Sequence, residues 1–296
     1  MPSLSARFVG FVLRTTGMYR KMFAGGPLFR ETLAKIRMAR LAEPGAKMKA
    51  KLDVSQAEFQ GQPVWKITPK NRAPTAHILY WHGGGYVYPA APVHWAFLAG
   101  MAERYGWSVT APLYPLAPES DAERTTAFAL EFYREYTAAQ GGTPFLMGGD
   151  SAGGGLAATT AMLARDARLA LPSGMVLICP WLNLDPSHPD QKRIEPRDAI
   201  LSVSGIGEAG LLYAGTLALD DPRASPIFGD WGGLGPILAF GGGDDILVTD
   251  ARALAAKLPS VDYVEEAGMI HVWPIFTFPE SRKAQARMAD FAQGGL

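Results

Sequence analysis

Gly149-Asp150-Ser151-Ala152-Gly153 is the stretch that decides how this chain folds. It has the form G-x-S-x-G, in which a serine sits on a sharp turn between a buried strand and a helix. The apolar stretch Pro144–Met147 precedes it and the alanine-rich stretch Gly154–Ala170 follows it, which predicts a strand and then a helix. The glycines leave room for neighbouring chain, and the helix N-terminus brings positive partial charge to the serine. The pattern therefore predicts that Ser151 is a nucleophile.

A second glycine motif, His82-Gly83-Gly84-Gly85, directly follows the expected strand Ala76–Trp81. Consecutive glycines let backbone N–H groups turn toward a substrate oxygen, and loops of this type complete the oxyanion hole beside such a serine. The predicted donors are the amides of Gly83, Gly84 and Ala152. We expect His82 to shape the loop by hydrogen bonding rather than to act as a base. Asp150 is expected to bind structure near the turn, and Glu119 either braces neighbouring loops or is a solvated acid.

The acidic partner is expected in the glycine- and aspartate-rich segment after the expected strand Ile237–Phe240. An acid at the carboxyl end of a strand can orient an imidazole and stabilise its charged form. Asp245 directly precedes an apolar pair and is preferred over Asp244. Asp250 is expected to begin the next helix, where its charge suits the helix dipole.

The histidine best placed to meet this acid is His271, in the loop after the expected strand Val261–Glu265. The nucleophile Ser151, the acid Asp245 and this histidine then occur in the chain order that α/β hydrolases use. The remaining candidates fall within a strand, a helix and a long insertion: His77, His94 and His188.

From about residue 75 onward, expected strands and helices alternate, which predicts a mostly parallel sheet covered on both faces. Besides the elements named above, strands are expected at Ser108–Ala111 and Met175–Cys179, and helices at Pro92–Tyr105, Ala122–Ala139, Asp250–Leu258 and Pro279–Phe291. Short β-like runs are expected earlier, at Lys49–Ser55 and Val64–Ile67, and a mixed helical stretch is expected later, at Val203–Leu219. Chemistry in such sheets lies beyond the carboxyl ends of the strands. Residues 1–46 read as helical, and residues 182–235 form a long, proline-containing insertion, which is more often functional than idle. We predict that 1–46 and 182–235 form a helical cap and that 47–181 and 236–296 form the catalytic domain.

The amino-acid composition excludes several classes of partner and cofactor. Lys plus Arg equals Asp plus Glu, 28 against 28, which argues against a nucleic-acid partner and gives no reason to expect a highly charged substrate. The single cysteine, Cys179, permits no intrachain disulfide, reads as a buried core residue and suits the expected cytoplasmic location. No apolar run is long enough to span a membrane, and a signal peptide is not expected. No cysteine–histidine cluster has zinc spacing, so neither a metal nor another cofactor is expected.

Aromatic residues near the expected strand ends are the candidates for the substrate pocket: Tyr86, Trp95, Trp181 and Trp273, together with Tyr88. The N-terminal helical region is expected to cover the entrance with its Phe and Met side chains, Phe8, Phe11, Met18, Met22 and Phe23. Its basic residues, Arg7, Arg14, Arg20 and Lys21, also suit a helix at a membrane interface. We favour the cap and predict no stable membrane insertion.

These motifs make the chain resemble the hormone-sensitive-lipase-like esterases, also called bacterial family IV carboxylesterases. The resemblance covers roughly residues 75–295 and implies an α/β-hydrolase fold, with a mostly parallel eight-stranded sheet, flanking helices and a helical cap. It also implies a Ser151–His271–Asp245 triad, and a homodimer formed at the sheet edge near the last strand. The matching stretches are His82–Tyr86, Tyr114–Glu119, Gly149–Gly154, Asp245–Leu247 and Gly268–His271.

The chain departs from the family pattern at a few positions. Pro115 stands where the family usually has Arg, and Gly155 stands where it usually has Asn. The sequence Ser120-Asp121-Ala122-Glu123 replaces the stretch usual after the Pro-Glu pair. These positions support structure more than chemistry.

The predicted function is that of a serine carboxylesterase, which hydrolyses short- to medium-chain esters of small, uncharged molecules through an acyl-enzyme. The same triad would also serve a lactone or amide hydrolase. A third reading is a catalytically inactive ligand receptor, as in the plant gibberellin receptors that resemble this family but lack the triad histidine. The presence of His271 argues against that reading.

Overall fold

In the computed structural model, which describes residues 2–17, 19–39 and 41–294, eight strands form one sheet in the order β1-β2-β4-β3-β5-β6-β7-β8. The pairs β1/β2 and β2/β4 are antiparallel, and every other neighbouring pair is parallel. The predicted fold class, a mostly parallel eight-stranded sheet flanked by helices, is confirmed. The strands are β1 Leu52–Phe59, β2 Gln62–Pro69, β3 Ala76–Trp81, β4 Trp107–Pro112, β5 Leu146–Asp150, β6 Gly174–Ile178, β7 Ile237–Gly242 and β8 Asp262–Glu266.

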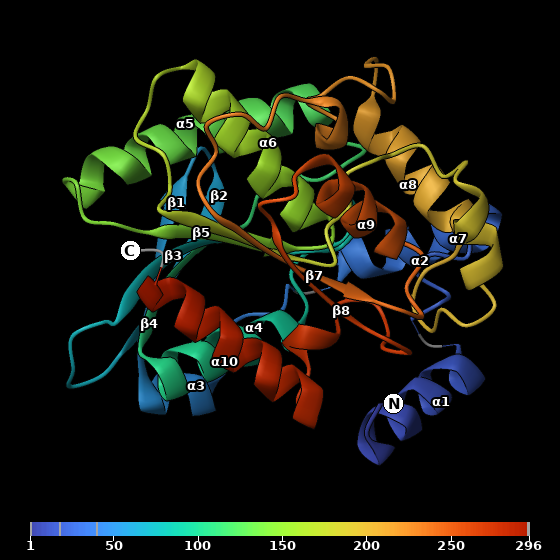
Figure 1. Cartoon of the computed structure of the whole chain (residues 1–296), viewed down its shortest axis with the longest axis horizontal. Coiled ribbons are helices and arrows are strands. Elements are labelled where there is room, and N and C mark those ends of the chain that lie inside the picture. The colour runs from blue at the N-terminus through green and yellow to red at the C-terminus, as the bar shows by residue number, and fades with distance from the viewer. Residues whose placement is uncertain (1, 18, 40, 295–296) are drawn as a thin grey trace.

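Helices cover both faces of this sheet (Figure 1). Figure 1 shows α5, α6 and α9 above the sheet, α3, α4 and α10 below it, and α7 and α8 at the side where β7 and β8 lie. The N-terminal α1 stands apart from these layers at the lower right of the view. The helices are α1 Leu4–Thr16, α2 Gly26–Met38, α3 Ala46–Lys51, α4 Pro92–Tyr105, α5 Ala122–Gln140, α6 Ala152–Asp166, α7 Pro189–Ile194, α8 Val203–Ala214, α9 Val248–Lys257 and α10 Pro279–Gly294, with 3-10 turns at Pro226–Phe228 and Trp273–Ile275.

The strand β3 and the helix α4 have the bounds that the sequence predicts, and most other elements differ by one to four residues. The strand before Ser151 extends beyond the expected end at Met147 and finishes at Asp150. Gly148 and Gly149 continue β5, and both positions require glycine because neighbouring backbone approaches too closely for a side chain. A Cβ at Gly148 would lie 2.7 Å from the Val176 carbonyl oxygen, and one at Gly149 would lie 2.6 Å from that of Trp81.

The run Lys49–Ser55 is not a continuous strand, because residues up to Lys51 form the helix α3. In the insertion, the helical stretch expected to reach Leu219 ends at Ala214. Gly215 there adopts a φ of 62°, a conformation that favours glycine and stops the helix.

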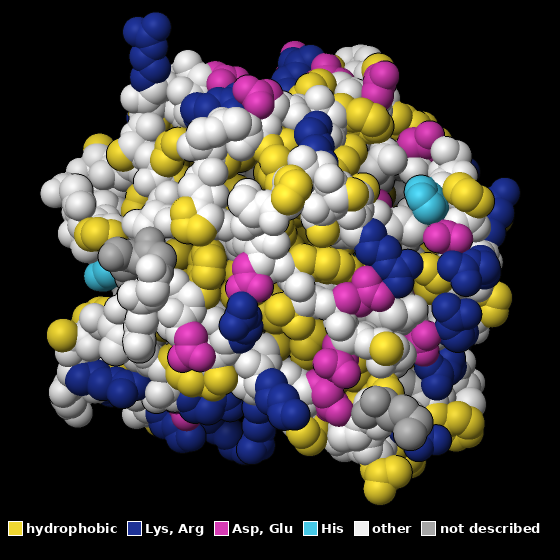
Figure 2. Space-filling view, in the orientation of Figure 1, with side chains coloured by type: hydrophobic (Ala, Val, Ile, Leu, Met, Phe, Trp, Pro, Cys, Tyr) yellow, Lys and Arg dark blue, Asp and Glu magenta, His cyan; other side chains and the backbone are white. Residues whose placement is uncertain are grey.

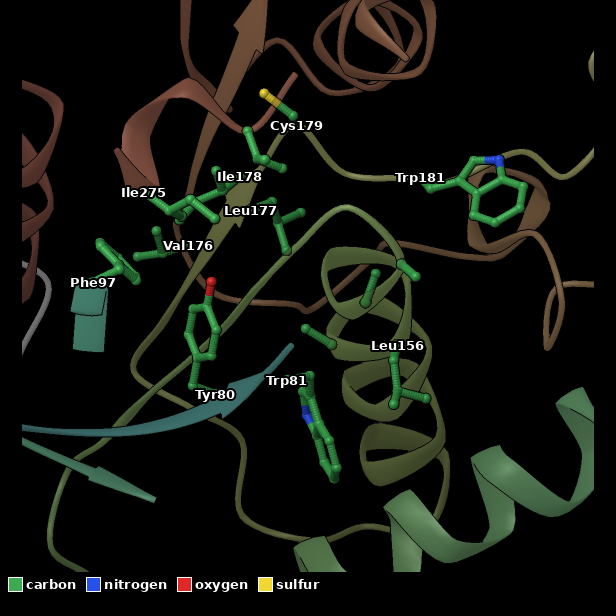
Figure 3. Close-up of a cluster of buried hydrophobic side chains, with 14 of the residues drawn as sticks. Tyr80, Trp81, Phe97, Leu156, Val176, Leu177, Ile178, Cys179, Trp181 and Ile275 are labelled. Atoms are coloured by element: carbon green, nitrogen blue, oxygen red, sulfur yellow. The ribbon is translucent and has the colours of Figure 1, made fainter. Parts of the chain in front are cut away.

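Side chains on the two faces of the sheet build one continuous core (Figure 3). Tyr80 and Trp81 point to opposite sides of β3, as the alternation of a strand requires. Trp81 lies beside Leu156 of α6, whereas the Tyr80 hydroxyl points toward β6. The core thus fixes β3, β5 and β6 relative to α6, and these are the elements that end at the candidate site.

Acidic and basic side chains intermingle over the surface seen in Figure 2, with basic groups gathered along its lower edge. This agrees with the equal numbers of the two kinds of charge. Within the described residues, every helix is too short or too polar to cross a membrane.

Candidate active site

Ser151 occupies a strained turn between β5 and α6. Its φ of 54° and ψ of −122° are rare for a residue with a side chain, and such strain persists only where the surroundings impose it. Its amide donates to the Ile178 carbonyl at 2.9 Å, and a Cβ at Gly153 would overlap the Trp81 carbonyl. Ser151 is thereby held at the carboxyl edge of the sheet, where it lines a cavity.

His271 and Asp245 form a hydrogen-bonded pair beside this serine. The imidazole Nδ1 lies 2.8 Å from Asp245 Oδ2, and both side chains are buried. The carboxylate's other oxygen accepts from the Leu247 amide at 2.8 Å, which leaves the first oxygen for the imidazole. With its Nδ1 proton donated to the acid, His271 has Nε2 free to accept a proton.

Electrostatics favour the charged form of this histidine. Burial alone would lower the pKa of His271, but the nearby negative charge of Asp245 and its hydrogen bond outweigh burial and raise it. The neighbouring Val272 has a φ of 49°, a strained value for a β-branched residue. An imidazole so placed can take a proton and keep it while a reaction proceeds.

Asp150 links the nucleophile turn to the glycine loop. Its Oδ1 accepts from the Tyr80 hydroxyl at 2.7 Å and from the Gly83 amide at 3.0 Å, and its Oδ2 lies 3.2 Å from His94 Nε2. His94 Nδ1 accepts from the Ala91 amide at 2.8 Å, so its Nε2 carries the proton and donates to Asp150. Burial opposes ionisation of Asp150, but His94, Tyr80 and Gly83 together hold its pKa below the usual range.

This arrangement corrects one predicted oxyanion donor. The Gly83 amide is engaged by Asp150, so it positions the loop and does not face a substrate. The amides of Gly84 and Ala152 donate to no group within the described part of the chain, and Gly84 lines the same cavity as Ser151. Gly84 has a φ of 129°, and the Tyr88 carbonyl occupies the space that its Cβ would need.

His82 shapes the loop, as predicted. Its Nδ1 lies 2.7 Å from the Gly83 carbonyl oxygen, and its ring stacks on Tyr114 with centroids 4.5 Å apart. Burial, with a smaller contribution from His94, lowers the pKa of His82 to about 4, so it is neutral at pH 7.

The two rival aspartates have other partners. Asp244 pairs with Arg197 at 2.9 Å. Asp250 lies in the first turn of α9, as expected, and is buried there. Its carboxylate accepts from the amides of Leu182 and Asn183 at 2.7 and 2.8 Å, and so holds the start of the 182–235 insertion.

The cavity above Ser151 has a volume of about 90 Å³ and a mostly apolar lining. Segments far apart in the sequence contribute to it: the N-terminal region, the glycine loop, the insertion and the histidine loop. Its apolar lining residues include Tyr19, Met22, Phe23, Tyr88, Pro89, Val93, Ile200, Leu201, Val272, Ile275 and Phe276.

The prediction for the pocket aromatics is wrong for all four main candidates. Tyr86, Trp95, Trp181 and Trp273 are at most 3% exposed and belong to the core, outside the lining of this cavity. Each of them has a partner within the protein. The Tyr86 ring stacks on Tyr213 with centroids 3.5 Å apart. The indole N–H groups of Trp95, Trp181 and Trp273 donate to the carbonyls of Ala42, Asn183 and Gly241, respectively. Of the aromatics considered, Tyr88 does line the cavity.

The N-terminal region divides into two parts. Met22 and Phe23 line the cavity, as the cap prediction requires, whereas Phe8 and Phe11 are 67% and 59% exposed on α1. Met18 lies outside the described residues. Arg37 of α2 donates to the carbonyls of Val87 and Ala117 and also pairs with Glu119. The Glu119 side chain is 69% exposed, so it is a solvated acid that contacts the loops only through Arg37.

The departure at Gly155 has a steric cause. A Cβ there would lie 2.5 Å from the Tyr86 hydroxyl and would overlap the Trp181 carbonyl. Tyr86 and Trp181 thus occupy the space in which an asparagine side chain would begin.

Among the described residues, one group of His, Cys and acidic side chains is close enough to hold a metal: Cys179, Asp245 and His271, whose candidate ligand atoms lie within 4.8 Å of one another. In this group, His271 Nδ1 and Asp245 Oδ2 are already hydrogen-bonded to each other through a shared proton.

The fold and the site together define an α/β hydrolase with a serine, a histidine–aspartate pair and a glycine loop around one cavity. A family model described as the alpha/beta hydrolase fold matches residues 78–275. An acetyl-hydrolase of Streptomyces hygroscopicus is 34% identical over 70% of this chain and 72% of its own length. An esterase of Acinetobacter venetianus is 30% identical over 74% and 75%.

The crystal structure of an esterase from the bacterial hormone-sensitive lipase family superposes with a TM-score of 0.80. It is 27% identical, and the match covers 100% of this chain and 99% of that one. The chain therefore belongs to the hormone-sensitive-lipase-like esterases of the alpha/beta hydrolase family, and it is a carboxylic ester hydrolase.

Sequence reasoning missed three features of this site. The first is His94, whose position at the start of α4 places Nε2 on Asp150. The second is the apolar pair Ile200-Leu201 inside an otherwise polar part of the insertion, which could have signalled a buried wall. The third is Asp198, a fully buried acid for which the sequence carries no pattern.

Proposed function

We propose that this chain is a serine carboxylesterase that acts through a triad of Ser151, His271 and Asp245. His271 Nε2 takes the proton of the Ser151 hydroxyl as its oxygen attacks the ester carbonyl. The same imidazole then protonates the leaving alcohol, and it later activates the water that releases the acid from the acyl-enzyme. The observation that carries the proposal is the 2.8 Å bond between His271 Nδ1 and Asp245 Oδ2, next to a serine that lines the same cavity.

The oxyanion of the tetrahedral intermediate would rest on the amides of Gly84 and Ala152, with Gly85 as the next amide in the loop. The free donors at Gly84 and Ala152 support this assignment, which replaces Gly83. Loss of one such donor typically costs about 3 kcal/mol of transition-state stabilisation.

The substrates would be uncharged esters with short to medium acyl chains, with a preference for the short end. The cavity volume of about 90 Å³ supports this preference, because it is small beside the roughly 300–1,000 Å³ of typical ligand pockets. Its apolar lining supports an uncharged acyl group. The acetyl-hydrolase activity named for the Streptomyces relative points the same way.

Residues 1–46 and 182–235 would form the cap over the site. Side chains of both segments line the cavity, and the segments are bonded to each other. Glu208 of α8 accepts from the Gly26 amide at 2.6 Å and from Arg30 at 2.7 Å. The Ser202 hydroxyl donates to the Phe23 carbonyl. The cap would then act as one unit that sets the size of the acyl pocket.

The test is hydrolysis of p-nitrophenyl esters from C2 to C16 by the wild type, Ser151→Ala and Ser108→Ala. Ser108 is the matched control, because it is a buried serine of β4 whose hydroxyl faces Thr68. We expect activity to peak at C2 to C4, to disappear in Ser151→Ala and to persist in Ser108→Ala. Activity should rise with pH through the pKa of His271, since only the neutral imidazole accepts the serine proton. Activity retained in Ser151→Ala would refute the mechanism, and inactivity of the wild type on every ester would turn attention to lactones, amides or ligand binding.

We also propose a homodimer formed at the β8 edge of the sheet, which Figure 1 shows beyond β7. Sedimentation at micromolar concentration would test it, and a species of about 32 kDa alone, the 31.8 kDa mass of one chain, would refute it.

A further inference from the structure

Asp198 lies in the insertion, between α7 and α8. Its side chain is fully buried, yet its carboxylate accepts three backbone hydrogen bonds. Oδ1 accepts from the Ile200 and Leu201 amides at 2.8 and 2.9 Å, and Oδ2 accepts from the Ile246 amide at 2.9 Å. A single side chain therefore ties the insertion to the segment that carries the triad acid.

Both ends of this link reach the site. Ile200 and Leu201 line the cavity above Ser151. Ile246 directly follows Asp245, and the next amide, that of Leu247, donates to Asp245 itself. Two carboxylates thus accept from consecutive amides at the start of α9, where the helix dipole stabilises negative charge.

Asp198 also acts on the triad through its charge. Burial first, and then repulsion from Asp245, raises the pKa of Asp198 to about 7. Its negative charge in turn helps to raise the pKa of His271, after the larger effect of Asp245. The low dielectric constant around three buried groups makes such interactions stronger than they are at a surface.

We propose that Asp198 is a positioning residue of the ester-hydrolysis site: it fixes the loop of Asp245 against the cavity wall and places a second negative charge beside His271. This proposal rests on the proposed role of His271 as the base. It goes beyond the triad, because the residue belongs to the insertion and not to the sheet domain.

The charged and titratable groups around this cluster come from several elements. Arg20 of the N-terminal region donates to the Asp198 carbonyl at 3.5 Å, and the adjacent Arg197 is paired with Asp244. The other ionisable groups near Asp198, Asp245 or His271 are Cys179, Asp150, Asp250 and Glu195. Asp198→Asn leaves all of these groups in place.

The experiment compares pH profiles of kcat/KM for p-nitrophenyl acetate in the wild type, Asp198→Asn and Asp250→Asn. The matched control Asp250 is also buried and also holds the insertion, but through Leu182 and Asn183 at its far end. Removing the Asp198 charge lowers the pKa of His271, so the acidic limb of Asp198→Asn should move to lower pH by about 1 unit. The acidic limb of the wild type should reflect two coupled deprotonations, those of His271 and Asp198. The acidic limb of Asp198→Asn should reflect the deprotonation of His271 alone. The limb of Asp250→Asn should stay in place.

A measurement independent of activity separates this inference from the proposed function. The protein has five histidines, so a His271→Gln spectrum assigns the His271 signal in a ¹⁵N-histidine NMR titration. We expect the wild-type His271 signal to show a second inflection from Asp198, which remains measurable even if Asp198→Asn does not fold. A single inflection in the wild type, or equal limb shifts in both variants, overturns the inference. Inactivity of wild type and variants alike would instead overturn the proposed function.

Discussion

The substitution Asp150→Asn tests how the nucleophile turn holds the glycine loop. The carboxylate has three donors directed at it: the Tyr80 hydroxyl, the Gly83 amide and His94 Nε2–H. All of these groups are buried, so water does not replace a lost partner. Asparagine has the same shape but offers one acceptor oxygen and two N–H donors.

Neither orientation of the new amide satisfies all three donors. If its oxygen faces Tyr80 and Gly83, its NH₂ group faces His94 Nε2–H, which cannot change tautomer because Nδ1 accepts from Ala91. If its oxygen faces His94, the Gly83 amide loses its acceptor. Each case leaves one buried N–H unpaired, at about 1–3 kcal/mol. We therefore expect the free energy of unfolding to fall by that amount.

Activity should fall as well, because the Gly83 amide holds the loop that presents Gly84. A displacement of about 1 Å in such a loop can reduce kcat about 100-fold, so we expect a loss of about 10- to 100-fold in kcat with a smaller change in KM. Urea unfolding and kcat on p-nitrophenyl acetate measure the two effects. Asp121→Asn is the matched control, since Asp121 accepts from a single amide at the start of α5 and asparagine serves there equally well.

A double-mutant cycle with His94→Ala identifies the orientation. If the new NH₂ group faces His94, removing the imidazole relieves the conflict, and the two substitutions together cost less than the sum of their separate effects. Stability within about 0.5 kcal/mol of the wild type, together with kcat within about twofold, would show that Asp150 does not hold the loop, and the reasoning would be wrong.

Three further predictions concern other parts of the chain. Gly155→Ala should destabilise the protein by about 1–3 kcal/mol in urea unfolding, because its Cβ would overlap the Trp181 carbonyl; an unchanged midpoint would contradict this. Burial raises the pKa of Asp250 from 3.8 to about 7, so the folded protein binds a proton that the unfolded chain releases, and stability is lost as pH rises through this range. The unfolding free energy of Asp250→Asn relative to the wild type should therefore increase, by up to about 4 kcal/mol, between pH 4 and 7, and a flat difference would show that burial does not raise this pKa. Gly205→Ala should move α8 away from Phe23, whose carbonyl its Cβ would overlap, and shift the ester preference to longer chains; an unchanged preference would show that this contact does not set the pocket.

The elements that the sequence predicts well are those whose patterns are local. Strand β3 and helix α4 have the expected bounds, since an apolar run and a proline at the first helical position mark them. The positions of Ser151 and Asp245 beyond strand ends could be predicted, because each follows a strand in a tight, glycine-containing turn. Such patterns can be recognised from neighbouring residues alone, without information about residues far away in the sequence.

Residues whose role depends on distant partners could not be predicted in this way. Asp198 meets Ile246, which lies 48 positions later in the chain, and no local pattern reports that pairing. Trp181 and Trp273 lie near strand ends, as expected, but donate to carbonyls of Asn183 and Gly241 and fill the core. Proximity to a strand end does not determine whether an aromatic ring faces the cavity or the core. The prediction that these residues line the substrate pocket is wrong for this reason.

The two glycine motifs of the chain, His82–Gly85 and Gly149–Gly153, pack against each other. β3 and β5 are neighbours in register, with Trp81 opposite Gly149, so the glycine loop and the nucleophile turn leave the sheet side by side. A Cβ at Gly153 would overlap the Trp81 carbonyl, and a Cβ at Gly83 would overlap the Asp150 carboxylate. Each motif therefore has a glycine at the position where a side chain would collide with residues beside the other motif. A substitution at Gly153 should consequently disturb the His82–Gly85 loop as much as the turn of Ser151, although it lies 70 positions from Gly83 in the chain.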